Sequence, residues 1–149
     1  MIDDKAAEIF EKLANRNLFG NDLESFLDVF KYYTNKSEYA EDELYGWERI
    51  VQVNLRDFEN FYIKTEEPFA DHPKLAIEYG NADSPDTVIT ADRDSFTGII
   101  SGRLYSFMVE ERFKIEGDNT QAVIFFMLLR LIEQELTEKE KKRKLGKNF

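Results

Sequence analysis

The sequence predicts an α+β fold, in which helices pack on a mostly antiparallel sheet. The first third of the chain repeats its apolar residues with a helical period, and from Arg49 onward the period changes to two. Four strand-like segments follow, and then a helix, a strand and a helix. At 149 residues the chain is long enough for one domain, and we expect residues 1–149 to form a single one.

The first two helices are predicted by apolar residues that recur three and four positions apart. These are Ala6, Ile9, Phe10 and Leu13 in the first helix, and Leu23, Phe26, Leu27, Phe30 and Tyr33 in the second. Residues 15–22 break the pattern, and Asn21 or Asp22 stands where it would cap the second helix. The polar stretch 34–48 leaves room for one more short turn of helix.

Strands are predicted where apolar and polar residues alternate, because such a segment has one dry and one wet face. Four of these segments follow one another in the middle of the chain, at residues 51–55, 61–65, 75–79 and 86–91. Short polar turns rich in Gly, Asn, Asp and Pro separate them. A fifth short strand is expected around Phe113 and Ile115, and Gly117 should end it.

Two further helices are predicted in the second half of the chain. Asp92 can cap the first of them, which continues through Phe96, Ile99 and Ile100 as far as Gly102. The apolar segment 104–109 fits either a helix or a strand.

The last helix is expected at about 119–137, with Asp118 and Gln121 in a capping arrangement. Between residues 122 and 132 every residue except Arg130 is apolar, so at least two faces of this helix must be dry. A helix buried within the core, a dimer interface and the wall of an apolar ligand cavity all explain this pattern.

Composition excludes several classes of chemistry. The chain has no cysteine and one histidine, His72, which we expect in an exposed loop. We therefore expect no metal site and no cofactor. Asp92 and Asp94 are better explained as groups that stabilise a helix start than as a catalytic pair. Phosphate-binding glycine loops and the common hydrolase motifs are missing from the sequence.

Charge and targeting signals bear on partners and location. The formal net charge is −10, which argues against a nucleic-acid partner. A basic tail at about 138–149 carries six basic and two acidic residues, and it allows at most transient contact with a membrane surface. The acidic start, MIDDKAAEIF, does not fit a secretory signal, so we expect a cytoplasmic protein.

Three linked segments make residues 45–135 resemble the sterol carrier protein (lipid-transfer) domain family. SPDTVITADRDSF (84–96) resembles the strand-to-helix passage of that family. FTGIISGRL (96–104) is similar to its helix and turn, and RFKIEGDNTQA (112–122) to its last strand and the start of its final helix. The strand pair VQVNL and NFYIKT resembles the family's opening hairpin. The helical extension at about 1–45 is longer than the single helix with which the family begins.

The resemblance implies a five-stranded mixed sheet with helices on one face and a hydrophobic tunnel between the two layers. A sterol, a fatty acid or another lipid would bind there, without catalysis, and be transported. By position, the residues nearest to the ligand would be Phe96, Ile99, Ile100, Leu104, Phe107, Met108, Phe125, Phe126 and Leu129.

Two other functions stay open at this point. The same fold with a closed core could be a protein-interaction or homodimerisation module, with the last helix in the interface. An enzyme that acts on a small molecule through Asp92, Asp94 or tyrosine side chains is the third hypothesis.

Overall fold

The computed structural model describes residues 2–105, 108–118, 120, 134 and 138. The predicted last helix and the basic tail fall outside this range, apart from three single positions.

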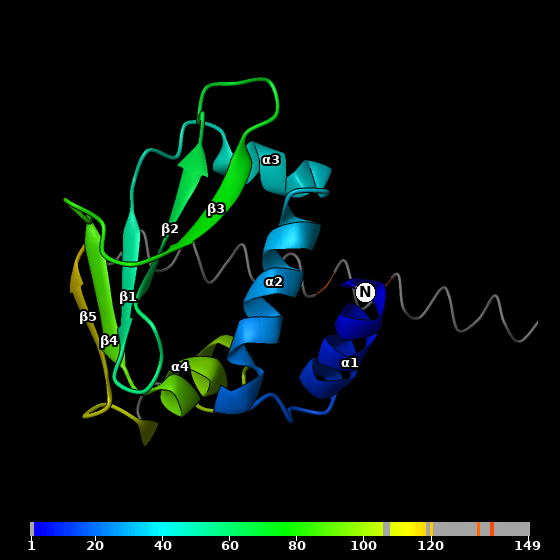
Figure 1. The fold of residues 1–149 in the computed structure, drawn as a ribbon, viewed down its shortest axis with the longest axis vertical. Coiled ribbons are helices and arrows are strands. Elements are labelled where there is room, and N and C mark those ends of the chain that lie inside the picture. The colour runs from blue at the N-terminus through cyan, green and yellow to red at the C-terminus, as the bar shows by residue number, and fades with distance from the viewer. Residues whose placement is uncertain (1, 106–107, 119, 121–133, 135–137, 139–149) are drawn as a thin grey trace, which may run out of the picture.

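A five-stranded mixed sheet forms one layer of the molecule (Figure 1), and the predicted α+β class is confirmed. The strand order is β3-β2-β1-β4-β5. Three neighbouring pairs are antiparallel, and β1 pairs with β4 in parallel. The strands are β1 (Val51–Leu55), β2 (Phe61–Glu66), β3 (Lys74–Tyr79), β4 (Thr87–Ala91) and β5 (Phe113–Gly117).

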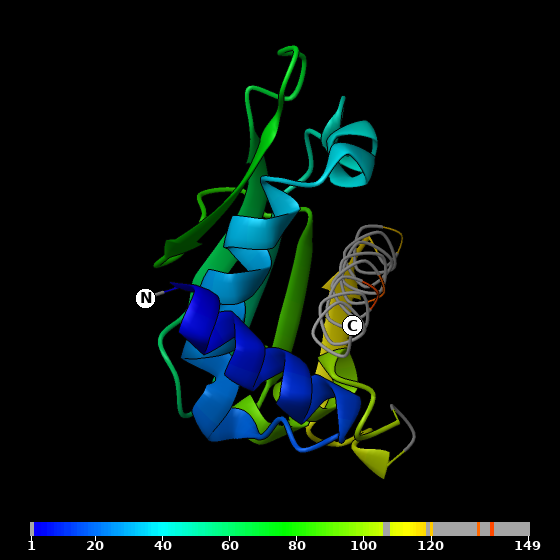
Figure 2. The same ribbon diagram turned by 90° about the vertical axis from the view of Figure 1, so that its right-hand side faces the viewer.

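The described helices lie on one side of this sheet (Figures 1 and 2). The long helix α2 runs across the sheet, α1 lies beside α2, and α4 covers the end where β1 and β4 finish. The α-helices are α1 (Ile2–Ala14), α2 (Leu23–Thr34), α3 (Glu38–Leu44) and α4 (Arg93–Ile100), and the short 3-10 helix η1 (Gly20–Asp22) precedes α2.

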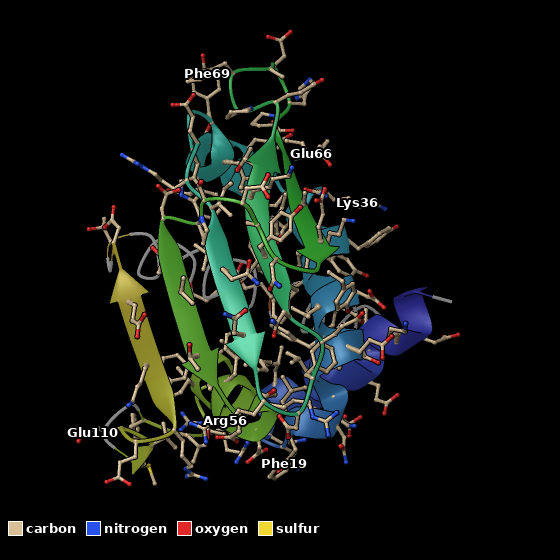
Figure 3. All side chains as sticks on the ribbon, turned by 60° about the vertical axis from the view of Figure 1, so that its left-hand side comes forward. Phe19, Lys36, Arg56, Glu66, Phe69 and Glu110 are labelled. Atoms are coloured by element: carbon tan, nitrogen blue, oxygen red, sulfur yellow. The ribbon has the colours of Figure 1, made fainter. Side chains whose placement is uncertain are left out.

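The period of two in the sequence separates the two faces of the sheet as expected. The side chains of β1, β2 and β4 that point toward the helices are buried, and with apolar side chains of the helices they form one hydrophobic cluster. The central members of this sheet face are Val51, Val53, Phe61, Ile63 and Ile89, and none of them is exposed. The opposite face, toward the viewer in Figure 3, carries mainly polar residues. Because β3 and β4 are separated by two strands, the connection between them crosses this polar face (Figure 3).

One of the predicted caps is confirmed and one is wrong in its mechanism. The Asp92 carboxylate accepts a hydrogen bond from the Ser95 N–H at 2.9 Å and caps α4. Asp22 occupies the N-cap position of α2, but its carboxylate does not cap that helix. It accepts instead from the Phe19 N–H at 3.0 Å and from Lys12 Nζ at 2.6 Å. Asp22 therefore closes the turn before α2 and ties it to α1.

The segment whose secondary structure the sequence left open is irregular. Among its described residues, Leu104, Tyr105, Met108 and Val109 belong to neither an α-helix nor a β-strand. Gly102 precedes them with a φ of 78°, a left-handed conformation that suits glycine and ends α4.

Candidate functional site

Five of the nine residues predicted to lie near a ligand are described by the structure. Phe107, Phe125, Phe126 and Leu129 lie outside the described residues. The other five belong to α4 and to the segment that follows it, and they differ strongly in burial.

Phe96 and Ile100 belong to the hydrophobic cluster beneath α4. The Phe96 side chain is completely buried, and its ring centroid lies 6.0 Å from that of Phe61 on β2, with the planes at 75°. This edge-to-face contact attaches α4 to the centre of the sheet. Ile100, one turn later on the same side of the helix, is also buried.

Ile99, Leu104 and Met108 are less enclosed than Phe96 and Ile100. Ile99 and Leu104 are half-buried, whereas 54% of Met108 is exposed. Leu104 folds back onto α4, because its N–H donates to the Gly98 carbonyl at 2.9 Å. A Cβ on Gly98 would lie only 2.5 Å from Leu104 Cδ1, so the glycine makes room for the leucine. Apolar side chains thus extend from the core to the surface at the end of α4.

The helix-facing side of β5 provides further apolar surface. Phe113 and Ile115 pair with Ala91 and Ile89 of β4, which are fully buried, yet both β5 residues are only half-buried. Sequence reasoning placed these residues in a strand but not in the site. Their alternation with charged residues indicates one apolar face, and the position of β5 at the sheet edge could not be read from it.

The turn around Leu18–Gly20 holds α4 from the outside. Arg103 Nε donates to the Leu18 carbonyl at 3.1 Å, and the Gly20 N–H donates to Asp94 Oδ1 at 3.1 Å. The Arg103 guanidinium lies 4.2 Å above the centroid of the Phe19 ring. The N-terminal extension is therefore bonded directly to the helix that carries three of the predicted site residues.

The carboxylates considered for catalysis have structural roles. Burial would raise the pKa of Asp92, but hydrogen bonds from the Ser95 hydroxyl and N–H outweigh it and hold the pKa below its usual value. Asp94 pairs with Arg103 at 2.7 Å. His72 is exposed in the loop before β3, as predicted, with its Nδ1 3.1 Å from Glu41 Oε1. Within the described part of the chain, no group of three His, Cys, Asp or Glu residues could hold a metal ion.

A surface cavity of about 530 Å³ lies on a different part of the molecule. Among the described residues, those that line it belong to α2 or the turn after it, namely Asp28, Lys31, Tyr32, Asn35 and Lys36. None of the five predicted residues that the structure describes borders it. The cavity is open to solvent and does not coincide with the apolar surface between α4 and β5.

Comparison with protein families identifies the chain. Residues 30–130 match the model of the SCP-2 sterol transfer family, and the chain belongs to this family. The match begins within α2, so α1 and η1 precede it. A comparison with curated proteins found none that is similar to the chain in sequence.

Solved structures of sterol carrier domains have the same fold. One is described as "UbiJ-SCP2 Ubiquinone synthesis protein"; it is 16% identical with a TM-score of 0.53, over 71% of this chain and 86% of its own. Sterol carrier protein domain 2 of Helicoverpa armigera is 17% identical, with a TM-score of 0.52, over 78% of this chain and 90% of its own. The apo form of sterol carrier protein 2 from Yarrowia lipolytica is 13% identical, with a TM-score of 0.51, over 73% and 90%.

None of the helices among the described residues is long and apolar enough to cross a membrane.

Proposed function

We propose that this protein binds a hydrophobic ligand between its helices and its sheet and carries it without chemical change. The ligand would be a sterol, a fatty acid or another lipid. Membership of the SCP-2 sterol transfer family is the observation that carries this proposal. In support of it, the five-stranded sheet turns one apolar face toward the helices.

The ligand would lie between α4 and the β4–β5 end of the sheet. The half-buried side chains of Ile99, Phe113 and Ile115 favour this location, because apolar groups that are incompletely covered can pack against an acyl chain. The predicted site residues Phe107, Phe125, Phe126 and Leu129 would complete the walls of a tunnel. Each methylene group removed from water would stabilise the complex by about 0.8 kcal/mol, so affinity should increase with chain length.

Two measurements test the proposal. Native mass spectrometry of the purified protein should detect a lipid that co-purifies with it, and unlabelled fatty acids should displace a fluorescent fatty acid. If neither co-purification nor displaceable binding is found, the carrier function is excluded.

A pair of variants tests the location. Ile115→Glu places a charge on the helix-facing side of β5 and should weaken fatty-acid binding at least tenfold, which is about 1.4 kcal/mol. Thr90→Glu is the matched control, because Thr90 pairs with Lys114 on the polar face of the same two strands. It should bind like the unmodified protein. If both variants bind normally, the ligand lies elsewhere.

One of these variants also tests the second hypothesis, that the protein is an interaction module with a closed core. Light scattering of the unmodified protein and of Ile115→Glu gives their masses in solution. A dimer that the substitution dissociates, with no lipid binding in either form, would favour that second function.

A further inference from the structure

The edge of the sheet at β3 carries backbone groups that point away from the other strands. β3 is the last strand on this side, and its bonds to β2 extend to Gly80, whose N–H donates to the Asn60 carbonyl at 2.7 Å. Because backbone groups in an antiparallel pair alternate between the two sides of a strand, those of Glu78 face β2, whereas those of Ile77 and Tyr79 face outward. Among the described residues, nothing forms a hydrogen bond with these outward groups.

One position of the same edge is already paired, by a side chain. The Asn35 carboxamide donates to the Leu75 carbonyl at 3.1 Å and accepts from the Leu75 N–H at 2.7 Å. These are the two bonds that a residue of a neighbouring strand would make. Leu75 precedes Ile77 and Tyr79 in the same alternation, so its contacts with Asn35 agree with the outward direction of their backbone groups.

A cavity lies beside this edge. The surface cavity of about 530 Å³ is bordered by Asn35, which bonds to β3, and by Asp28, whose charge acts on Tyr79. These two residues place the cavity along the outer side of β3, next to α2. Figure 3 shows Lys36, which also lines it, on that side of β3. The lining is mainly apolar, so the cavity suits an apolar side chain.

Carboxylates gather at the Tyr79 end of the edge. Tyr79 is 46% exposed; partial burial raises the pKa of its hydroxyl, and three negative charges raise it further, those of Glu24, Asp28 and Glu59. Asp28 is paired with Lys5 at 3.2 Å. Glu24 and Glu59 are exposed and form no ion pair within the part of the chain that the structure describes. A cation placed over the Tyr79 ring would therefore meet two carboxylates.

The other end of the edge is basic. Lys31 and Lys36 line the cavity, and Lys74 Nζ donates to the Asn35 carbonyl at 3.0 Å. Glu78 lies on the opposite face of the sheet, where it already accepts a hydrogen bond from the Tyr62 hydroxyl. The unequal charge along the edge favours an added strand whose basic residue lies at Tyr79.

A second copy of this chain fits the edge less well than a separate peptide. Antiparallel pairing about a two-fold axis at Ile77 would oppose Leu75 to Tyr79 of the second copy. Asn35 would then have to leave Leu75. Moving the axis to Glu78 would place the two copies of this carboxylate directly opposite each other, and like charges in that position destabilise a sheet.

We propose that the outer edge of β3 binds an extended peptide segment of another protein, which adds to the sheet as a further antiparallel strand. Its backbone would bond to Ile77 and Tyr79, and an apolar side chain would enter the cavity beside α2. A lysine or arginine would lie over Tyr79, within reach of Glu24 and Glu59. This interaction goes beyond the proposed carrier function, because β3 and β5 lie at opposite edges of the sheet.

Hydrogen exchange tests the backbone pairing. The probe is the blocked peptide Thr-Val-Thr-Lys-Thr-Val-Thr, which presents valine and lysine on one face when extended. The Ile77 and Tyr79 amides should exchange faster than the Glu78 amide in the free protein, and saturating peptide should slow both by about tenfold or more. The Glu78 amide, which is bonded to β2, should change little. If the peptide does not bind, or leaves the two outward amides unprotected, the proposal is overturned.

Methylated peptides test the mode of pairing. In the proposed arrangement the lysine N–H of the peptide faces β3, and the N–H of the following threonine faces away. N-methylation of the lysine should abolish binding, whereas N-methylation of that threonine should have a much smaller effect. Equal effects at the two positions would exclude addition of a strand.

A charge exchange tests the orientation. Glu24→Lys combined with Glu59→Lys should weaken binding of the peptide about fivefold or more and should strengthen binding of a peptide with glutamate in place of lysine. Glu110→Lys combined with Glu111→Lys makes the same change in net charge before β5 and should do neither. Urea unfolding establishes that both variants are folded. If the two variants behave alike toward both peptides, the carboxylates at Tyr79 do not select the partner and the proposal is wrong.

Light scattering separates a peptide partner from self-association. The unmodified protein should keep the same mass when the peptide is added, apart from the mass of the peptide itself. A dimer that the peptide dissociates would assign the β3 edge to a second copy of the chain and overturn the proposal.

Discussion

Arg103 and Asp94 form an ion pair at 2.7 Å that closes the C-terminal end of α4 back onto its beginning. The arginine side chain is 15% exposed and the aspartate side chain 51%. Since Arg103 also donates to the Leu18 carbonyl and Asp94 accepts from the Gly20 N–H, the pair joins α4 to the N-terminal extension. Residues 1–29, which the family match does not include, are thereby connected to the candidate site.

Replacing Arg103 should destabilise the protein. Arg103→Ala removes hydrogen bonds to a carboxylate and to a carbonyl, and we expect a loss of about 1.5–3 kcal/mol in the free energy of unfolding. Arg103→Lys should recover only part of it, because an ammonium group cannot donate to Leu18 and Asp94 with the same planar geometry. Urea unfolding measures both. Arg56→Ala is the control and should change stability by less than about 0.5 kcal/mol; an equally small effect of Arg103→Ala would contradict the structural role.

A side chain at position 98, where the chain has Gly98, should lower the stability of the protein. Alanine is favoured over glycine in a helix by about 1 kcal/mol, yet here its Cβ would lie 2.5 Å from Leu104 Cδ1. Overpacking should outweigh the helix propensity, and Gly98→Ala should destabilise the protein by about 1–3 kcal/mol. Thermal unfolding of Gly98→Ala, Leu104→Ala and the double variant tests whether the contact with Leu104 causes this loss of stability. If the leucine is responsible, adding the alanine substitution at Gly98 should be neutral or stabilising in the Leu104→Ala background.

The local elements were predictable because their signals are local. The period of two marked β1 to β5, and Asp92 before an apolar helix marked the start of α4. The prediction that the Asp22 side chain caps α2 was wrong because a carboxylate beside a turn has several hydrogen-bond donors within reach. In the structure it accepts from Lys12 Nζ and from the Phe19 N–H instead. The parallel pairing of β1 with β4 was not predictable, because the period of two marks a strand but does not indicate which other strand becomes its neighbour in the sheet.

The candidate site was predictable only as apolar surface. Phe96, Ile100 and Ile99 follow the same helical spacing, but two of them are core and one is half-buried. Periodicity shows which face of a helix is shielded from water. It does not show whether the protein core or a bound ligand shields that face. The contact of Arg103 with Leu18 spans 85 positions, so composition and spacing gave no indication of it.

Gln52 should stabilise the connection from β3 to β4. Although it lies on the polar face, it is only 3% exposed, since its amide donates to the Phe61 and Gly80 carbonyls and its carbonyl accepts from the Ala82 N–H at 2.8 Å. Gln52→Leu leaves these groups without their partner, and we expect a loss of about 1–3 kcal/mol.

Hydrogen exchange provides a local measurement of the same substitution. The Ala82 amide should exchange faster in Gln52→Leu than in the unmodified protein, even after correction for global stability. Gln52→Glu retains an acceptor for that amide and should protect it better than leucine does. Unchanged protection in both variants would mean that the crossover is held by other contacts.

Stability at acidic pH should depend on Asp92. Burial raises the pKa of this carboxyl, but the hydrogen bonds from Ser95 lower it further, so the folded-state pKa lies below that of the unfolded chain. The sign follows from linkage: Asp92 contributes its full stabilisation above the unfolded pKa of about 4 and loses it as the pH falls through the lower folded-state value. The asparagine in Asp92→Asn cannot ionise. Loss of the negative charge at the start of α4 should lower the free energy of unfolding by about 0.3–1 kcal/mol at neutral pH. The difference between the two proteins in urea unfolding should therefore become smaller as the pH falls below about 4. Asp71→Asn, in the exposed loop between β2 and β3, makes the same change in net charge, and a difference of the same size and pH dependence there would show that net charge, not the cap of α4, is responsible.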